Sequence, residues 1–139
     1  MESSPDCLFC RIVGGELPAQ RVYEDERTIA FMDINPTSRG HVLVVPRTHS
    51  ADLLDIEADD LAACLNAAQH IAGWQRFRLK ADGVNLLQST GRAASQVVFH
   101  FHLHVIPRYE GDGMVNPLAR SPGNPDEIAA VAAELRGDD

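Results

Sequence analysis

Residues 99–106 read FHFHLHVI, so that histidine alternates with an apolar residue. On a strand, successive side chains point to opposite faces. The pattern therefore predicts that His100, His102 and His104 share one face, while the apolar residues face the core. Half of the 6 histidines in the 139-residue chain lie in this stretch. We therefore expect the histidine face to be a functional site rather than the outer side of an ordinary strand.

Apolar patterns and turn residues predict the other elements of the chain. Two strands are expected around a turn that contains Pro36 and Gly40, which favours an antiparallel hairpin. Apolar residues recur at helical spacing over residues 57–80, and Asn124 followed by Pro125 is typical of the start of a closing helix. The strands are expected at residues 28–34, 41–45, 83–89 and 97–106. This order predicts an α+β domain with an antiparallel sheet.

Length, charge and composition narrow the class of protein. The length fits a single domain over residues 1–139, with a core at about residues 5–110 and a loop plus helix over residues 111–139. A formal net charge of −8 without a basic run argues against nucleic-acid binding, although local cations and backbone amides can still bind a small anion. The first residues lack a signal-peptide pattern, and no apolar stretch approaches the roughly 20 residues of a membrane span. We expect a cytoplasmic protein that does not bind membranes.

The alternating histidines permit more than one chemistry. One metal ion bound by all three is a poor fit, because at about 3.3 Å per residue the Cα atoms of His100 and His104 lie roughly 13 Å apart. A neutral imidazole whose second nitrogen holds a fixed proton is a good nucleophile, and phosphorus is a natural target. Neighbouring histidines could then bind phosphate oxygens or protonate a leaving group. A hydrolase that uses the histidines as ligands of a catalytic metal ion is a further alternative.

Several segments resemble the histidine triad (HIT) family. Residues 100–106 match its alternating histidine pattern, and residues 9–12, 29–36 and 40–46 are similar to its other signature segments in the same order. The similarity covers about residues 5–110 and is greatest to small bacterial HIT hydrolases of nucleoside phosphoramidates and dinucleoside polyphosphates. The resemblance implies a HIT-like fold, in which about five antiparallel strands accompany one long helix and a C-terminal helix. It also implies a homodimer whose sheets continue across the subunits.

The resemblance also implies roles for individual residues. His102 would attack the α-phosphorus and carry the nucleotide transiently, while His104 and Gln96 would contact the phosphate and His41 would support them. Asp33 would accept hydrogen bonds from the ribose hydroxyls, a role suited to a carboxylate with two oxygens. The base would lie in an apolar slot. The implied nucleotide-binding set is Phe9, Ile12, Phe31, Asp33, Ile34, Ser89, Ser95, Gln96 and His104.

Two positions depart from the pattern of many HIT proteins. Ser95 stands where relatives often have glycine, and Val97 stands where they often have a serine or threonine that assists the leaving group. We expect a hydrolase or transferase that acts on a purine nucleotide or nucleotide conjugate without an organic cofactor. The alternative function is a zinc-stabilised module that binds purine nucleotides with little turnover.

The chain has 3 cysteines, and two of them form a Cys-x-x-Cys motif at Cys7 and Cys10. In some bacterial HIT proteins and related nucleotidyltransferases, such a pair binds zinc together with two histidines, which the resemblance places at His49 and His100. Two cysteines and two histidines make a closed tetrahedral site that is structural. The alternative is a thioredoxin-like redox pair, although the strand–helix–strand setting of such motifs is absent here. The third cysteine, Cys64, falls on the apolar stripe of the long helix and is expected in the core.

Overall fold

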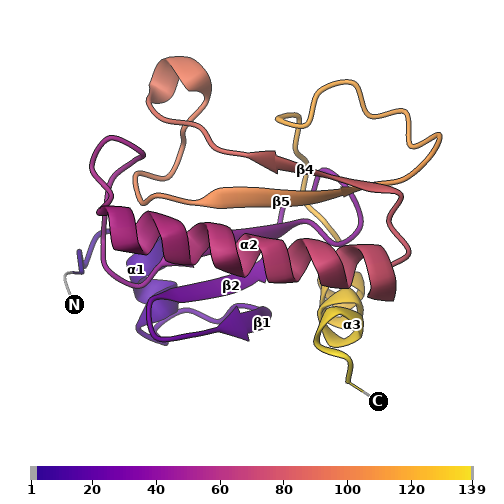
Figure 1. The fold of residues 1–139 in the computed structure, drawn as a ribbon, viewed down its shortest axis with the longest axis horizontal. Coiled ribbons are helices and arrows are strands. Elements are labelled where there is room, and N and C mark those ends of the chain that lie inside the picture. Colours follow the sequence, from indigo (N-terminus) through magenta and orange to yellow (C-terminus); the bar gives the residue numbers. More distant parts are fainter. Residues whose placement is uncertain (1–2, 139) are drawn as a thin grey trace.

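A five-stranded antiparallel sheet in the order β1-β2-β3-β5-β4 forms the centre of the computed structural model, which describes residues 3–138 (Figure 1). The strands are β1 (Arg21–Glu24), β2 (Thr28–Met32), β3 (Val42–Pro46), β4 (Gly83–Leu87) and β5 (Leu103–Arg108). The helices within this range are α1 (Leu8–Val13), α2 (Ala58–Arg78), the short 3-10 helix η1 (Arg92–Ala94) and α3 (Pro125–Arg136). The predicted α+β class is confirmed.

The two faces of the sheet carry separate apolar clusters, because side chains alternate along each strand. On β3, Val42 and Val44 belong to the cluster beneath α2, whereas Leu43 and Val45 belong to the cluster on the opposite face. Figure 1 shows α2 lying across the sheet. His104 of β5 is directly opposite Leu43 in the register, and therefore faces away from α2.

The helices α2 and α3 are held by buried apolar stripes. Cys64 and Ile71 of α2 are fully buried, which confirms that Cys64 is a core residue. The Asn124 side chain accepts hydrogen bonds from the backbone N–H groups of Asp126 and Glu127, so it caps α3 as predicted. α3 packs against β1 and α2. Its buried residues are those of the predicted stripe: Ile128, Val131, Ala132 and Leu135.

Gln75 connects α2 to the sheet through side-chain hydrogen bonds. Its buried side chain donates hydrogen bonds to the backbone oxygens of Gly40 and Val105, at 3.0 and 2.9 Å. Gly40 adopts φ +98°, and a Cβ atom at this position would lie 2.3 Å from Cδ1 of Leu79. The turn before β3 therefore needs glycine both for its backbone conformation and for its close contact with the end of α2.

The histidine strand is shorter than predicted. β5 begins at Leu103 rather than at residue 97, so His100 and His102 precede the strand. The partner strand β3 ends at Pro46, and the N–H of Phe101 donates instead to the backbone oxygen of Ser50 at 2.6 Å. Phe101 remains in the cluster beneath α2, but Phe99 is 40% exposed and does not join it.

The sequence pattern did not predict α1, β1 or η1. α1 has 6 residues and β1 has 4, which is too short for a clear period. The strands predicted at 28–34 and 83–89 also end early, at Met32 and Leu87. Within residues 3–138, no helix combines the length and the apolar content needed to cross a membrane.

Candidate functional site

A cavity of about 520 Å³ opens on the sheet face that lies opposite α2. We call it the histidine groove, because His102 and His104 form part of its wall. Pro117 and Leu118 line it from the long segment between β5 and α3. Of the predicted nucleotide-binding residues, those in its lining are Phe9, Ile12, Phe31, Asp33, Ile34, Ser95 and His104.

His102 has one ring nitrogen fixed by the backbone. Its Nδ1 lies 2.7 Å from the carbonyl oxygen of His100, which can only accept, so Nδ1 carries the proton and Nε2 keeps a lone pair. The ring meets Phe9 edge-on at 5.1 Å between centroids, and burial lowers the pKa of His102 from its ordinary value. The side chain is therefore a neutral imidazole with an available basic nitrogen.

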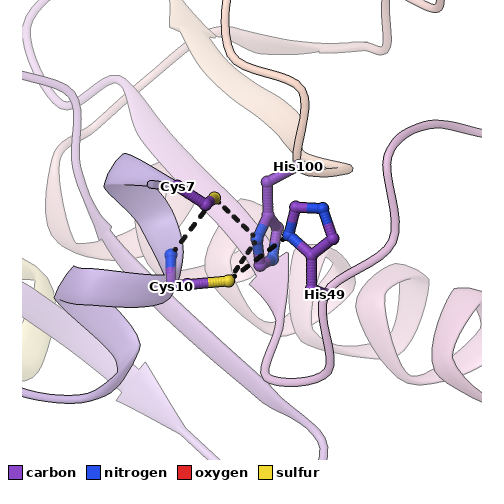
Figure 2. A group of neighbouring side chains, drawn as sticks. All are labelled: Cys7, Cys10, His49 and His100. Atoms are coloured by element: carbon purple, nitrogen blue, oxygen red, sulfur yellow. Dashed lines mark hydrogen bonds between the residues drawn. The ribbon is translucent and has the colours of Figure 1, made fainter. Parts of the chain in front are cut away.

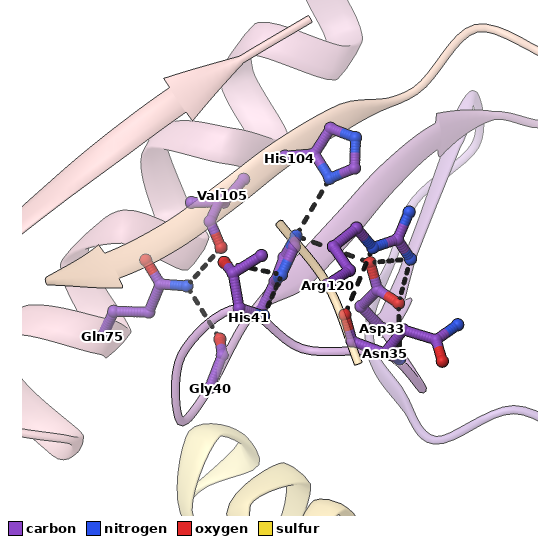
Figure 3. A network of polar contacts seen from close by, with 9 residues as sticks. Asp33, Asn35, Gly40, His41, Gln75, His104, Val105 and Arg120 are labelled. Carbon is purple, nitrogen blue, oxygen red and sulfur yellow. Dashed lines mark hydrogen bonds and ion pairs between the residues drawn. The ribbon is translucent and has the colours of Figure 1, made fainter. Parts of the chain in front are cut away.

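A chain of hydrogen bonds also orients His41 and His104. The N–H of Thr37 donates to Nδ1 of His41 at 3.1 Å, so the proton of His41 is on Nε2. This Nε2 lies 2.9 Å from Nδ1 of His104 and donates to it, which leaves the proton of His104 on its own Nε2 (Figure 3). Burial lowers the pKa of both rings to about 3. His104 thus offers the groove an N–H donor, while fully buried His41 lies behind it.

Asp33 follows β2 and is 2% exposed. Its Oδ1 accepts a hydrogen bond from the N–H of Asn35 at 2.8 Å, and its Oδ2 lies 3.5 Å from Nε2 of His41. Nη2 of Arg120 lies 2.5 Å from Oδ1 and 2.6 Å from Oδ2 (Figure 3). Arg120 was not predicted as a site residue. It is 87 positions from Asp33 in a segment without periodic structure, and no local pattern marks it.

Gln96 and Ser89 are not brought into the groove lining. The Gln96 side chain is occupied by the loop around it: it accepts from the N–H of Gly91 at 2.7 Å and donates to the oxygens of Ala51 and Val98 at 2.8 and 3.1 Å. Ser89 is buried outside the lining. Gln96 therefore shapes the loop that presents Ser95 instead of facing the groove itself.

Ser95 and Val97 are the two departures from the family pattern, and both line the groove. Ser95 has φ 75°, in the left-handed region that favours glycine. Val97 is 78% exposed and offers no hydroxyl group. At these two positions the lining of the groove contains a serine with a left-handed backbone and an exposed apolar side chain.

The predicted metal ligands meet in a second cluster next to the groove (Figure 2). Nδ1 of His100 lies 3.4 Å from Sγ of Cys7 and 3.5 Å from Sγ of Cys10, and Nδ1 of His49 lies 3.3 Å from Sγ of Cys10. Zinc bonds of about 2.3 Å to sulfur and about 2.0 Å to nitrogen at the tetrahedral angle place such atoms about 3.5 Å apart. The four side chains fit a tetrahedral metal ion.

The surroundings of the cluster agree with that fit. Nε2 of His100 lies 2.8 Å from the carbonyl oxygen of Pro46 and donates to it, so Nδ1 has the lone pair that a metal ion requires. Backbone N–H groups donate to both sulfur atoms at 3.4 Å, from Cys10 to Cys7 and from Ser4 to Cys10. These donors also stabilise negative charge on the sulfurs.

A second group of potential ligands, Asp33, His41 and His104, fits a metal ion poorly. Nδ1 of His41 already accepts a hydrogen bond from the N–H of Thr37, so the nitrogen that faces Asp33 and His104 carries the hydrogen. The guanidinium group of Arg120, which is permanently positive, already pairs with the carboxylate of Asp33 and would repel a cation there. These contacts argue against a catalytic ion held by these residues.

Comparisons with known proteins match this chain to a protein family and to solved structures. The HIT domain model matches residues 14–111. The chain is 45% identical over 109 residues to an uncharacterised HIT-like protein of Methanocaldococcus jannaschii, a match that covers 78% of this chain and 84% of that protein. It is 39% identical over 107 residues to an adenylylsulfatase of Arabidopsis thaliana, covering 77% of this chain and 54% of that protein. A zinc-bound histidine triad protein of Mycobacterium smegmatis is 42% identical with a TM-score of 0.87, over 97% of this chain and 94% of that one.

Proposed function

This chain belongs to the HIT family, and from that premise we propose that it transfers or hydrolyses nucleotides at the α-phosphate through a nucleotidyl intermediate on His102. The observation that carries the proposal is the hydrogen bond from Nδ1 of His102 to the oxygen of His100. It leaves Nε2 unprotonated at the open side of a buried, neutral ring. Such a nitrogen is a nucleophile at neutral pH without a separate base.

The reaction has two steps that use the same nitrogen. In the first, the lone pair of Nε2 of His102 forms a bond to the α-phosphorus while the bond to the leaving group breaks, and the leaving group takes its electron pair and acquires a proton. In the second, water attacks phosphorus and loses a proton, and the P–N electron pair returns to His102. The Nε2–H of His104 would donate to a phosphate oxygen, since His41 holds the opposite nitrogen.

In this proposal the groove would also hold the nucleoside. Phe9, Ile12 and Phe31 are buried and form an apolar wall beside the histidines, which suits the flat face of a base. Ile34 is 71% exposed at the edge, where a bound base would cover it. Asp33 would accept the ribose hydroxyls. The substrates expected are phosphoramidates, dinucleoside polyphosphates or, from the Arabidopsis relative, adenylyl sulfate.

The His102 proposal is tested by trapping the intermediate. Protein quenched during turnover should carry a nucleotidyl adduct on the peptide with His102, detected by mass spectrometry. The variant His102→Ala should form no adduct, and its kcat should fall at least about a thousandfold, because the covalent pathway needs this nucleophile. The variant His70→Ala removes an exposed histidine of α2 and should keep both. Full activity in His102→Ala would contradict the mechanism.

A second function is supported by Val97. Where a hydroxyl group could assist the leaving group, this chain presents an apolar side chain. A nucleotide-binding module with little turnover would bind AMP or GMP in calorimetry and leave all three expected substrate classes intact. Measurable turnover of any of them by the wild-type chain, lost in His102→Ala, would favour the enzyme.

A structural zinc ion is part of the proposed function. Cys7, Cys10, His49 and His100 would hold it, and it would supply folding energy rather than a step of the reaction. It would connect α1, the loop after β3 and the segment before β5, next to His102. Protein purified without chelator or added metal should contain one zinc per chain by metal analysis.

The proposed assembly is a homodimer. β4 lies at the edge of the sheet, where its outer backbone groups can pair with another strand. Leu65 of α2 and Leu86 of β4 are 46% and 50% exposed, and both line an apolar groove between these elements. A second copy of the chain would cover this face and extend the sheet.

A further inference from the structure

Arg120 lies where a bound sugar would have to be. It contacts both oxygens of Asp33, the carboxylate to which the proposed function assigns the ribose hydroxyls. We propose that Arg120 occupies the sugar subsite in the free protein as an internal substitute for ribose, and that it must leave before a ribonucleotide can bind fully. This inference rests on the proposed nucleotide site.

The hydrogen-bonding capacity of Asp33 supports displacement rather than sharing. A carboxylate offers about four lone-pair positions. One is taken by the N–H of Asn35 and one faces Nε2 of His41, while Arg120 takes one on each oxygen. The departure of Arg120 frees two positions, which equals the number of donors in the 2′,3′-diol of ribose. With Arg120 in place, at most the position that faces Nε2 of His41 is left, because that N–H donates to His104, and one position cannot accept from both hydroxyls.

The segment that carries Arg120 is held as a strap over the groove. We define the strap as residues 117–120, three of which (Pro117, Leu118 and Arg120) line the cavity. It is anchored just beyond its C-terminal end by the hydrogen bond from the N–H of Gly123 to the oxygen of Ile34 at 2.9 Å. In addition to Asp33, Nε of Arg120 donates to the oxygen of Asn35 at 3.2 Å.

The strap is free to move without disturbing the fold. Leu118, Ala119 and Arg120 are exposed as whole residues, and the strap belongs to no helix or strand. The anchor at Gly123 is closely packed, because a Cβ atom there would lie 2.8 Å from Cδ of Pro36. Rotation of the chain between the strap and this anchor would lift Arg120 from Asp33 and leave the start of α3 in place.

Displacement should lower the affinity of the wild-type chain. In the open state Arg120 has left Asp33. The apparent affinity of a ligand that binds only this state is the intrinsic affinity multiplied by the fraction of molecules that are open. Arg120→Gln removes the charged competitor, and should tighten the binding of AMP about tenfold, which is the value of roughly one charge-assisted hydrogen bond. Arg39→Gln is the matched control. It removes the exposed ion pair with Glu134, which also joins the hairpin to the C-terminal region, and should leave AMP affinity unchanged.

Trypsin reports the position of Arg120 directly. The protease needs a free arginine side chain in its specificity pocket, so the bond between Arg120 and Ser121 should resist cleavage while Arg120 is paired. Saturating AMP should accelerate cleavage at this bond at least about fivefold in the full-length protein, as followed by mass spectrometry. Saturating 2′,3′-dideoxy-AMP, which lacks the diol, should not. Asp33→Asn should be cleaved rapidly with or without AMP.

The outcomes separate this inference from the proposed function. If calorimetry shows AMP binding, but cleavage at Arg120 is unchanged and Arg120→Gln binds no more tightly, Arg120 is not a competitor and the nucleotide site stands. If neither the wild type nor Arg120→Gln binds AMP, the nucleotide site itself is wrong and the inference fails with it. Binding by Arg120→Gln alone would support both.

Discussion

His104 lies in the wall of the groove and fully buried His41 lies behind it, with Nε2 of His41 2.9 Å from Nδ1 of His104. Burial lowers the pKa of both residues to about 3, so both are neutral near pH 7. With His102 they present one lone pair and one N–H group at fixed places. A protonated ring would lose one of these contacts, and the low pKa values therefore keep the site in one hydrogen-bonding arrangement.

The buried histidines should make stability fall in acid. Between pH 6.5 and about 3 the unfolded chain binds protons that the folded rings of His41 and His104 do not, so the free energy of unfolding decreases as the pH falls. Each such ring contributes a slope of about 1.4 kcal/mol per pH unit. In urea titrations at pH 7, 6 and 5, the free energy of unfolding of His104→Gln should depend less steeply on pH than that of the wild type.

A variant of the same strand provides the control for that slope. Val105→Ala removes buried methyl groups and should lower stability by about 1–3 kcal/mol at every pH. Its pH dependence should match that of the wild type. Equal slopes of stability against pH in His104→Gln and the wild type would contradict the prediction, because His104 would then bind as many protons in the folded state as in the unfolded state.

At the scale of single elements, α1 depends on its surroundings more than on its own hydrogen bonds. It has 6 residues, too few for a stable isolated helix. Cys7 caps its first turn through Sγ, and Cys10 lies within it, so both cysteines hold it to the proposed zinc site. Phe9 and Ile12 of the same helix form the apolar wall of the groove. The proposed metal and nucleotide sites are thereby connected through one short helix.

Removal of zinc should therefore release α1. Treatment with a chelator, or Cys10→Ser, should lower the free energy of unfolding by several kcal/mol and accelerate amide hydrogen exchange in residues 8–13. AMP binding should weaken at the same time, because Phe9 and Ile12 leave the groove. Cys64→Ala, which alters a buried cysteine of α2, should retain one zinc per chain and the same response to chelator. Unchanged exchange in residues 8–13 after zinc is lost would contradict this dependence.

At the scale of the whole molecule, two faces of the sheet have different uses. α2 and α3 complete the core on one side, and the groove occupies the other. The sheet edge at β4 and the neighbouring side of α2 are left with exposed leucines. An uncovered apolar groove next to a free strand edge is a surface that association would bury.

The proposed dimer should dissociate when a charge is placed on this surface. Leu86→Glu puts a carboxylate where a second copy would pack, and sedimentation velocity should show a monomer in place of the wild-type dimer. Leu54→Glu alters a side chain that is 88% exposed outside this groove and should leave the mass unchanged. A wild-type chain that sediments as a monomer at high micromolar concentration would rule out the assembly.

The sequence alone predicted the features that repeat locally. The alternation around His104 predicted which side chains face the core, and it held for Phe101, Leu103 and Val105 because the period of two continues beyond the end of the strand. It failed for Phe99, where the chain has already left the sheet. Short elements such as α1 were missed because a single turn has no measurable period.

The resemblance named Cys7, Cys10, His49 and His100 as one set, and the structure brings them together. Spacing alone could not do so, because up to 93 positions separate the members of the cluster.

Only the tertiary structure placed Arg120 on Asp33. A lone arginine in a segment rich in glycine and proline has no pattern, and its partner depends on how the whole C-terminal segment returns over the groove. The tertiary structure also turned Gln96 away from the groove, because the loop around it uses every polar atom of its amide. Local periodicity follows from backbone geometry, which each residue shares with its neighbours. A contact between distant residues follows from the path of the chain, which no short stretch of sequence contains.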